Sequence, residues 1–163
     1  AILGMFAGIY HWFPKMYGKA MNKRMGMVHF WITIICGYGV FLPMHFLGEG
    51  GLPRRYYENT NFPMFDHFLD LNILISIFAS VGVIAQVIFF FNFFYSIFRG
   101  PRSSQNPWNS NSLEWTTPVE HVHGNWIGEI PIVHRWPYDY SKPGKEKDFV
   151  PQNVPLDDNE EEH

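Results

Sequence analysis

Residues 71–98 decide the fold class, and they read LNILISIFASVGVIAQVIFFFNFFYSIF. The stretch holds no Asp, Glu, Lys or Arg. A helix of about 20 apolar residues crosses the hydrocarbon core of a bilayer, because each residue adds about 1.5 Å to its length. The stretch therefore predicts a transmembrane helix, which we place at residues 68–98.

A second uncharged stretch, residues 25–48, is also long enough to cross a membrane. It contains Gly37, Gly39 and Pro43, residue types that are common in membrane helices packed against protein. The bulky residues Tyr38, Phe41 and Phe46 lie near these glycines. Such an alternation of small and bulky residues suits packing against another helix or against the flat ring of a cofactor. Packing between helices is the simpler interpretation, and a wall beside a cofactor is the alternative.

The remaining segments complete an all-α membrane protein. Residues 1–14 are apolar but too short to span, and we interpret them as the end of a transmembrane helix that starts before Ala1. The tail is rich in Pro, Asn, Ser, Trp and charge, which predicts irregular structure on the solvent side with a mobile acidic end. The other predicted segments are a basic loop at 15–24, a loop between the two spans at 49–67 and the tail at 99–163.

The basic residues next to the spans predict the orientation. Six of them fall on one side in a three-span arrangement, namely Lys15, Lys19, Lys23, Arg24, Arg99 and Arg102. The opposite loop holds only Arg54 and Arg55. Because loops rich in Lys and Arg stay inside, the first loop and the tail should lie on the cytoplasmic or matrix side. The arginine pair should then lie on the outer side.

Polar residues within the last span indicate its packing faces. Gln86 and Asn92 should face protein rather than lipid, because an unpaired polar group in hydrocarbon is costly. Ser76 and Ser80 are one helical turn apart and form a small-xxx-small pair, which predicts contact with a neighbouring helix.

Other chemistry is weakly indicated. The net charge of −3 does not suggest a nucleic-acid partner, and the single Cys36 cannot form a disulfide within the chain. Among the eight histidines, the three in or beside the spans lack the spacing of a ligand pair and should be interfacial or buried hydrogen-bonding residues. His121 and His123 make only a weak zinc site. We therefore predict no metal site and no catalytic residue.

The arginine pair, Arg54 and Arg55, indicates a binding site more strongly than the histidines do. Pro53 follows Gly50 and Gly51 and disfavours a helical backbone before it. An extended backbone is the natural continuation, and it would point Arg54 and Arg55 in opposite directions. Each guanidinium forms two hydrogen bonds to a carboxylate. The anions could be local acids, lipid headgroups or the carboxylates of a cofactor.

Five motifs occur in an order and spacing that resembles the C-terminal part of subunit I of the heme–copper oxidases. They are His11-Trp12-Phe13-Pro14, His45-Phe46-Leu47-Gly48, Pro53-Arg54-Arg55-Tyr56, Asn106-Pro107-Trp108 and Leu113-Glu114-Trp115. The resemblance covers residues 1 to about 118 and implies the last three helices of a twelve-helix bundle, the first of them truncated. The family often has a run of prolines after the Leu-Glu-Trp motif, and this chain does not.

The resemblance implies a proton-pumping terminal oxidase that passes electrons from cytochrome c to oxygen and forms water. The complete subunit would hold two hemes, expected to be of the a type, and copper. Arg54 and Arg55 match the residues that bind heme propionates, and Phe41 matches a position beside a heme. The ligands of the metals match no position in this chain.

The resemblance also implies partners and a location. The partners would be the N-terminal part of subunit I, subunits II and III, cytochrome c, membrane lipid and, in some respiratory chains, a supercomplex. The protein would lie in a bacterial plasma membrane or a mitochondrial inner membrane.

Two alternatives remain at this point. The first is a quinol oxidase of the same superfamily, although Pro53 and the motif that begins at His45 favour cytochrome c as the donor. The second is a structural membrane subunit or a transporter fragment without a cofactor, in which the arginines would meet lipid headgroups or acids such as Glu49 and Glu58.

Overall fold

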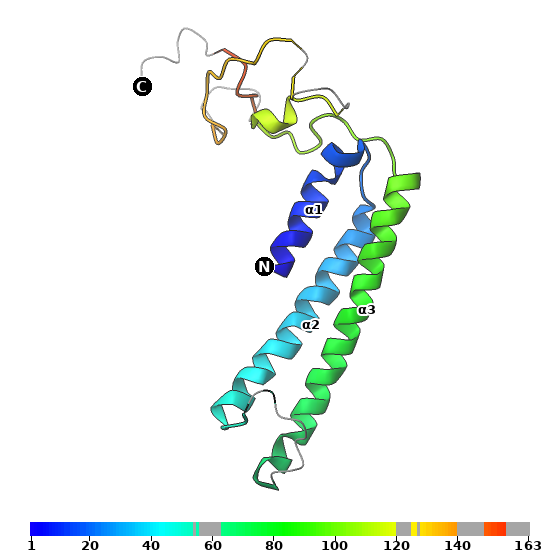
Figure 1. The fold of residues 1–163 in the computed structure, drawn as a ribbon, viewed down its shortest axis with the longest axis vertical. Helices are drawn as coiled ribbons and strands as arrows, with labels where there is room; N and C mark the ends of the chain where they lie inside the picture. Colours follow the sequence, from blue (N-terminus) through cyan, green and yellow to red (C-terminus); the bar gives the residue numbers. More distant parts are fainter. Residues whose placement is uncertain (54, 56–62, 120–124, 127, 140–148, 156–163) are drawn as a thin grey trace. The chain divides into compact units, whose positions relative to one another are not determined.

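The computed structural model describes residues 1–53, 55, 63–119, 125–126, 128–139 and 149–155 (Figure 1). The helices are α1 (Ile2–Tyr17), α2 (Lys23–Glu49) and α3 (Leu69–Arg99), with short 3₁₀ turns η2 (Pro63–Phe68) and η3 (Leu113–Trp115). The described residues contain no strand and one isolated bridge, between Lys19 and Arg102. The chain is therefore all-α, as predicted.

Two helical segments are long and apolar enough to cross a membrane, Lys23–Glu49 and Pro63–Arg99. The sequence placed these spans at 25–48 and 68–98. The backbone divides into two compact units, Asn22–Phe98 and the combination of Ala1–Met21 with Arg99–His163. Each unit is described below by itself.

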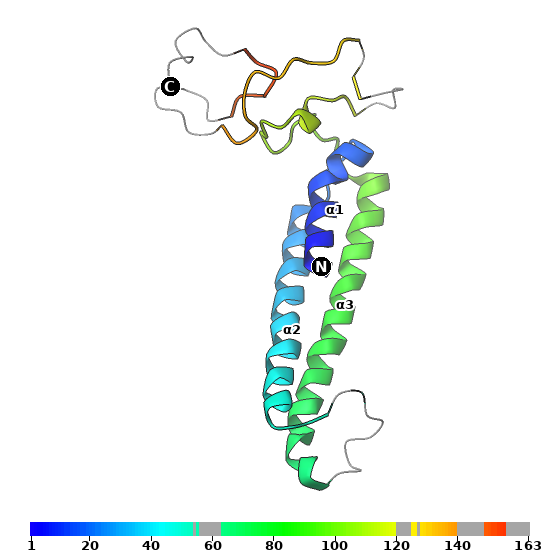
Figure 2. The ribbon, with the colours of Figure 1, turned by 60° about the vertical axis from the view of Figure 1, so that its left-hand side comes forward.

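The unit Asn22–Phe98 is a helical hairpin in which α2 and α3 run side by side in both views (Figures 1 and 2). Small residues allow the close approach. A Cβ added to Gly39 would lie 2.4 Å from Cγ of Phe78, and one added to Gly82 would lie 3.3 Å from Cβ of Cys36. At the turn, a Cβ on Gly50 would lie 2.1 Å from the ring of Phe68. The predicted packing of glycine against a helix is thus confirmed for Gly39.

Polar contacts continue the same antiparallel pairing toward the start of α2. His29 is 2% exposed, and its Nε2 lies 3.2 Å from Oε1 of Gln86. Asn92, which is fully buried, accepts a hydrogen bond from the backbone N–H of Asn22 and donates one to the carbonyl of Asn22. Asn22 is also the N-cap of α2, since its side chain accepts a bond from the N–H of Met25. Gln86 and Asn92 therefore face protein, as predicted.

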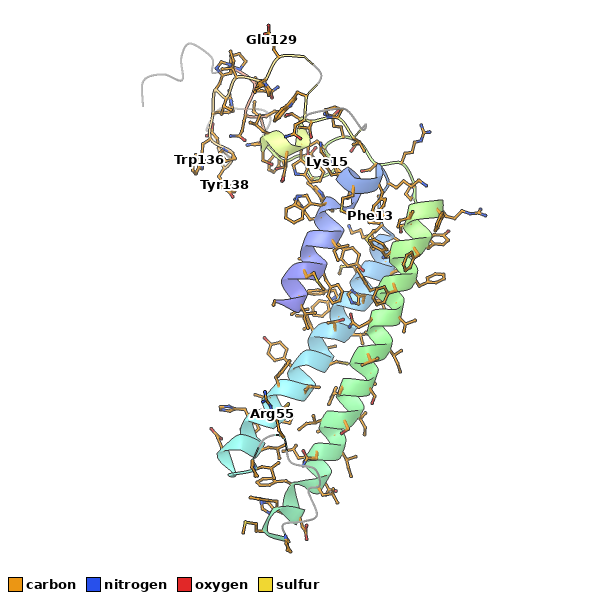
Figure 3. All side chains as sticks on the ribbon, viewed as in Figure 1. Phe13, Lys15, Arg55, Glu129, Trp136 and Tyr138 are labelled. Carbon is orange, nitrogen blue, oxygen red and sulfur yellow. The ribbon has the colours of Figure 1, made fainter. Side chains whose placement is uncertain are left out.

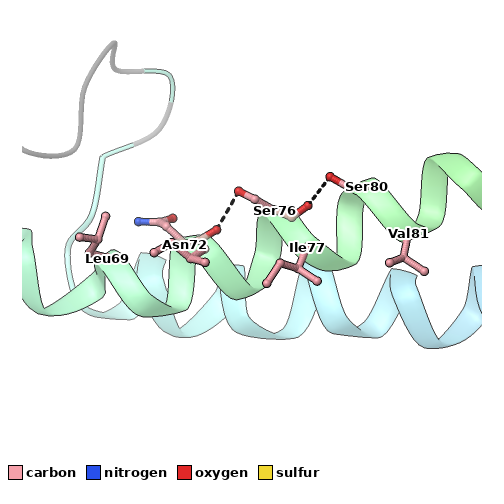
Figure 4. A pocket seen from close by; sticks show the side chains of 7 residues that line it. Leu69, Asn72, Ser76, Ile77, Ser80 and Val81 are labelled. Carbon is pink, nitrogen blue, oxygen red and sulfur yellow. Dashed lines mark hydrogen bonds between the residues drawn. The ribbon is translucent and has the colours of Figure 1, made fainter.

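Another face of α3 carries the serine pair. The hydroxyls of Ser76 and Ser80 donate to the carbonyls of Asn72 and Ser76, one turn back along the same helix (Figure 4). Both serines are exposed, and α2 packs instead on the face that holds Phe78 and Gly82. The neighbouring helix predicted for the serine pair is thus not α2. The face is a shallow groove lined by Leu69, Asn72, Ile73, Ser76, Ile77, Ser80 and Val81.

The other unit joins α1 to the tail. Helix α1 continues through Pro14 to Tyr17, so the loop expected from residue 15 begins later. Pro14 has no backbone N–H, so the helix lacks one hydrogen bond at this position. Gly18 closes the helix with φ 63°, a left-handed conformation that glycine adopts without a steric penalty. Backbone bonds from Ser103 to Gly18 and from Ala20 to Pro101 then fasten the tail to this end.

The tail has little regular structure, but its described part is held by specific hydrogen bonds. Gln152 bonds through its backbone N–H to the carbonyl of Asn111. Its side chain accepts from the N–H of Leu113 and donates to the carbonyl of Arg135. Asn111, which is fully buried, donates to the carbonyl of Asp139. The predicted acidic end lies outside the described residues.

Candidate functional site

The arginine pair follows the C-terminal end of α2. The N–H groups of Gly50 and Leu52 bond to the carbonyls of Phe46 and Leu47 and close the last turn of the helix. Gly51 has φ 83°, so the chain turns through a conformation suited to glycine. Arg54 lies outside the described residues. Arg55 is described and exposed, and Figure 3 labels its side chain on this connection.

Arg55 corrects the prediction of an extended backbone. Its φ is 63°, in the left-handed region that residues with a Cβ rarely adopt. The flexible Gly-Gly-Pro run permits extension, but the tight cap after α2 turns the chain instead. A residue other than glycine in the left-handed region costs of order 1–3 kcal/mol, and such residues cluster at active sites and ligand-binding segments. The strain at Arg55 therefore marks this connection as a candidate site.

Glu49, the acidic residue that precedes the arginine pair, has another partner. Oε1 of Glu49 lies 3.2 Å from Nε2 of His45, one turn earlier in α2. In the described part of the chain, no acidic side chain pairs with Arg55. Glu58 lies outside the described residues. For Arg55, the alternative in which Glu49 neutralises it is therefore not favoured.

Phe41 lies on the face of α2 that α3 leaves open. Its side chain is 73% exposed. Large exposed side chains recur at helical spacing along this face, at Trp31, Ile35, Tyr38, Phe41 and Leu42, with His45 following. Of the site residues predicted from the sequence, Phe41 thus lies on an exposed aromatic face of α2. Arg55 lies just beyond the end of α2 and has a strained backbone. Among the described residues, Phe41 and Arg55 make no hydrogen bond, ion pair or ring contact with each other.

The histidines form no metal site in the described ranges, where no three metal-ligating side chains gather. His29 is a buried hydrogen-bonding residue and His45 an exposed one, as expected. His121 and His123 lie outside the described residues.

A cluster that the sequence did not predict joins α1 to the tail. The His11 ring stacks on Trp108 at 5.6 Å and meets Trp115 edge-on at 5.2 Å. Trp108 donates to the carbonyl of His11, and Trp12 donates to Glu114. The sequence did single out these residues, since they belong to three of the motifs quoted above. Nothing in the spacing of the motifs, however, showed that they are in contact in the fold.

Lys15 completes this cluster. Its Nζ lies 6.0 Å from the centroid of the Trp115 ring and donates to the carbonyl of Thr117. Burial lowers the pKa of the Lys15 ammonium, and the Glu114 carboxylate opposes that shift. The cluster is a structural joint in which a cation, an acid and aromatic rings hold the tail on the end of α1.

Residues 1–81 match the family described as cytochrome c and quinol oxidase polypeptide I. The chain is 45% identical to the alternative cytochrome c oxidase subunit 1 of Bradyrhizobium diazoefficiens, over 94% of this chain and 26% of that relative. The chain belongs to this family. It is therefore an integral membrane protein of the heme–copper oxidase class.

Other relatives agree. The cytochrome c oxidase subunits 1 of Thermostichus vulcanus and of Synechocystis are 40% and 38% identical, over 86% and 83% of this chain and 24% of each relative. The chain thus spans about a quarter of the length of the curated relatives it matches. The match to the first relative extends well beyond residue 81, so it includes much of the tail.

Proposed function

We propose that this chain supplies the last three membrane helices of the catalytic subunit of a proton-pumping terminal oxidase. The whole enzyme would transfer electrons from cytochrome c to oxygen and release water. This part would pack beside a heme and bind its propionates. The observation that carries the proposal is the match of nearly the whole chain to proteins named cytochrome c oxidase subunit 1.

The residues of the candidate site fit a heme. Arg54 and Arg55 offer planar, permanently charged groups that bind carboxylates with paired hydrogen bonds. Arg55 is exposed, strained and without a described acidic partner, which suits an anion held from outside the chain. Phe41 and its neighbours on α2 offer an apolar, aromatic face for a flat ring. When bound, the heme supplies the redox chemistry, and these residues bind and orient it.

The charge of the arginines would also affect the heme electrostatically. Reduction adds an electron to the heme, so a nearby fixed positive charge favours the reduced form. Arg54 and Arg55 would therefore hold the heme in place and raise its potential.

The complete subunit would hold two hemes, proposed to be of the a type, and copper. Its partners would be the rest of subunit I, subunits II and III, cytochrome c and lipid, with a supercomplex in some respiratory chains. The tail would lie on the cytoplasmic or matrix side and the arginine pair on the outer side, which is supported by the six basic residues next to the spans. The membrane would be a bacterial plasma membrane or a mitochondrial inner membrane.

The electron donor is tested by oxygen consumption of the purified complex. We expect fast oxygen uptake with reduced cytochrome c and little uptake with a short-chain quinol, as the names of the relatives suggest. The same preparation serves both assays, so differences in heme content cancel. Faster uptake with quinol than with cytochrome c would replace this proposal by a quinol oxidase.

A further inference from the structure

The tail displays two large aromatic side chains on one tight turn. Trp136 is 67% exposed and Tyr138 is 69% exposed, and their ring centroids lie 5.9 Å apart. The N–H of Asp139 bonds to the carbonyl of Trp136 and closes the turn. Ile130 and Ile132, a few residues earlier, are also exposed. Neighbouring exposed rings form an apolar patch of the kind found at protein and membrane interaction sites.

This turn is a fixed part of the tail. The buried guanidinium of Arg135 donates to the carbonyls of Val154 and Pro155. It also lies 4.0 Å from the carboxylate of Asp139 on the other side of the turn. Gln152 and Asn111 donate to the carbonyls of Arg135 and Asp139, so both flanks are held. The rings are therefore presented by a braced backbone.

The position of the turn can be compared with that of α1, which belongs to the same unit. In Figures 1 and 2, which differ by a rotation about the vertical axis, the orange turn reaches the level of the last turn of α1. In Figure 3, Trp136 and Tyr138 lie at the level of Lys15, whereas Glu129 lies at the far edge of the tail. The basic residues Lys19 and Arg102 meet in the bridge at this same end of α1.

We propose that Trp136 and Tyr138 insert into the headgroup layer of the membrane and anchor the tail to its inner surface. Tryptophan and tyrosine prefer this layer, because it accommodates both their apolar rings and their polar N–H and O–H groups. Basic residues at the same level add attraction to anionic lipids. The inference rests on the proposed function in one respect, namely that α1 enters the membrane from this end.

The test measures how deep a label at each position lies. In the whole complex, p-acetylphenylalanine replaces Trp136, Tyr138 or, as the control, Glu129, and each carries a nitroxide. The complex is placed in vesicles of equal parts phosphatidylcholine and phosphatidylglycerol. Frequent collisions of the nitroxide with oxygen show that it lies in lipid, where oxygen is concentrated. Frequent collisions with a water-soluble nickel chelate show that it lies in water. We expect the oxygen-to-nickel ratio to be several-fold higher at 136 and 138 than at 129.

Two results would overturn the anchor. A ratio at 136 and 138 equal to that at 129 would place the turn in water. Protection of both labels from both reagents would place it under another protein subunit. The heme spectrum of each labelled complex separates these results from failure of the proposed function, since an intact spectrum shows that the oxidase has assembled.

A second measurement avoids the labels. In vesicles made with brominated phosphatidylcholine, Trp136→Phe should remove part of the lipid-quenched tryptophan emission of the complex. An unchanged quenched fraction in Trp136→Phe would contradict the proposal.

Discussion

At the scale of single residues, two deeply buried polar side chains of the hairpin, Asn92 and His29, have hydrogen-bond partners. Asn92 is fully buried but bonds both the N–H and the carbonyl of Asn22. His29 is buried but bonds Gln86, which in turn donates to the carbonyl of Gly82. These groups sit in the spans without the cost of an unsatisfied hydrogen bond. Arg55 differs from them, because no acidic partner is described and its backbone is strained.

Arg54→Gln and Arg55→Gln should each lower the midpoint potential of one heme, on the order of tens of millivolts, and slow turnover. The physical reason is the loss of a positive charge that favours the reduced heme. Redox titration followed by visible absorption measures the shift. Lys23→Gln is the matched control, because it removes an exposed positive charge from the other end of α2.

Arg55→Lys separates charge from geometry. It keeps the charge but loses the planar fork, so its potential should lie between those of the wild type and Arg55→Gln. Potentials and turnover unchanged in both glutamine variants would refute the assignment to the propionates.

At the scale of elements, α2 and α3 pack together through faces that carry small residues. Their other faces carry bulky side chains that are exposed in this chain. Gly39 and Gly82 bring the helices together, while Phe41 and Tyr38 remain exposed on α2. In a membrane, helices associate through close packing and hydrogen bonds, because lipid is as apolar as the side chains. The open face of α2 is therefore the one available to a cofactor or to helices outside this chain.

Gly39→Ala should destabilise the hairpin by about 1–3 kcal/mol, because the new Cβ would overlap Cγ at the root of the Phe78 ring. Rotation of the Phe78 ring does not relieve the overlap, because Cγ is the ring atom attached to the rest of the side chain. Thermal inactivation of the purified complex measures the effect as a lower midpoint temperature.

Gly37→Ala is the control for Gly39→Ala. No other described part of the chain lies within 4 Å of the Cβ it adds, and alanine favours a helix over glycine by up to about 1 kcal/mol. Adding Phe78→Ala to Gly39→Ala should recover part of the loss. Equal midpoints for the two alanine variants would show that Gly39 and Phe78 do not limit the packing of α2 on α3.

The sequence predicted the two long apolar helices well and the contacts of the tail poorly, for a physical reason. A long uncharged run is almost sufficient to specify a membrane helix. A polar side chain within such a run, such as Gln86 or Asn92, needs a hydrogen-bond partner from the protein, because lipid offers none. The joint of His11, Trp108 and Trp115 depends on residues about a hundred positions apart. The left-handed backbone of Arg55 was missed because Gly-Gly-Pro permits several paths, and the cap of α2 selects among them.

At the scale of the whole molecule, the chain consists of a hairpin of two spans and a separate unit of α1 with the tail. The hairpin carries the candidate heme site, and the other unit carries a braced turn with Trp136 and Tyr138. Both units belong to a family whose relatives are about four times as long as this chain. The function proposed here is thus a property of the assembled oxidase, to which this chain contributes binding and packing residues.

The most direct test is a reduced-minus-oxidised absorption spectrum of the complex purified through an affinity tag on this chain. The account predicts the bands of heme in the purified complex, and a shift of one heme potential in Arg55→Gln. A complex that contains this chain in stable form, with its partners, and shows no heme bands would contradict it.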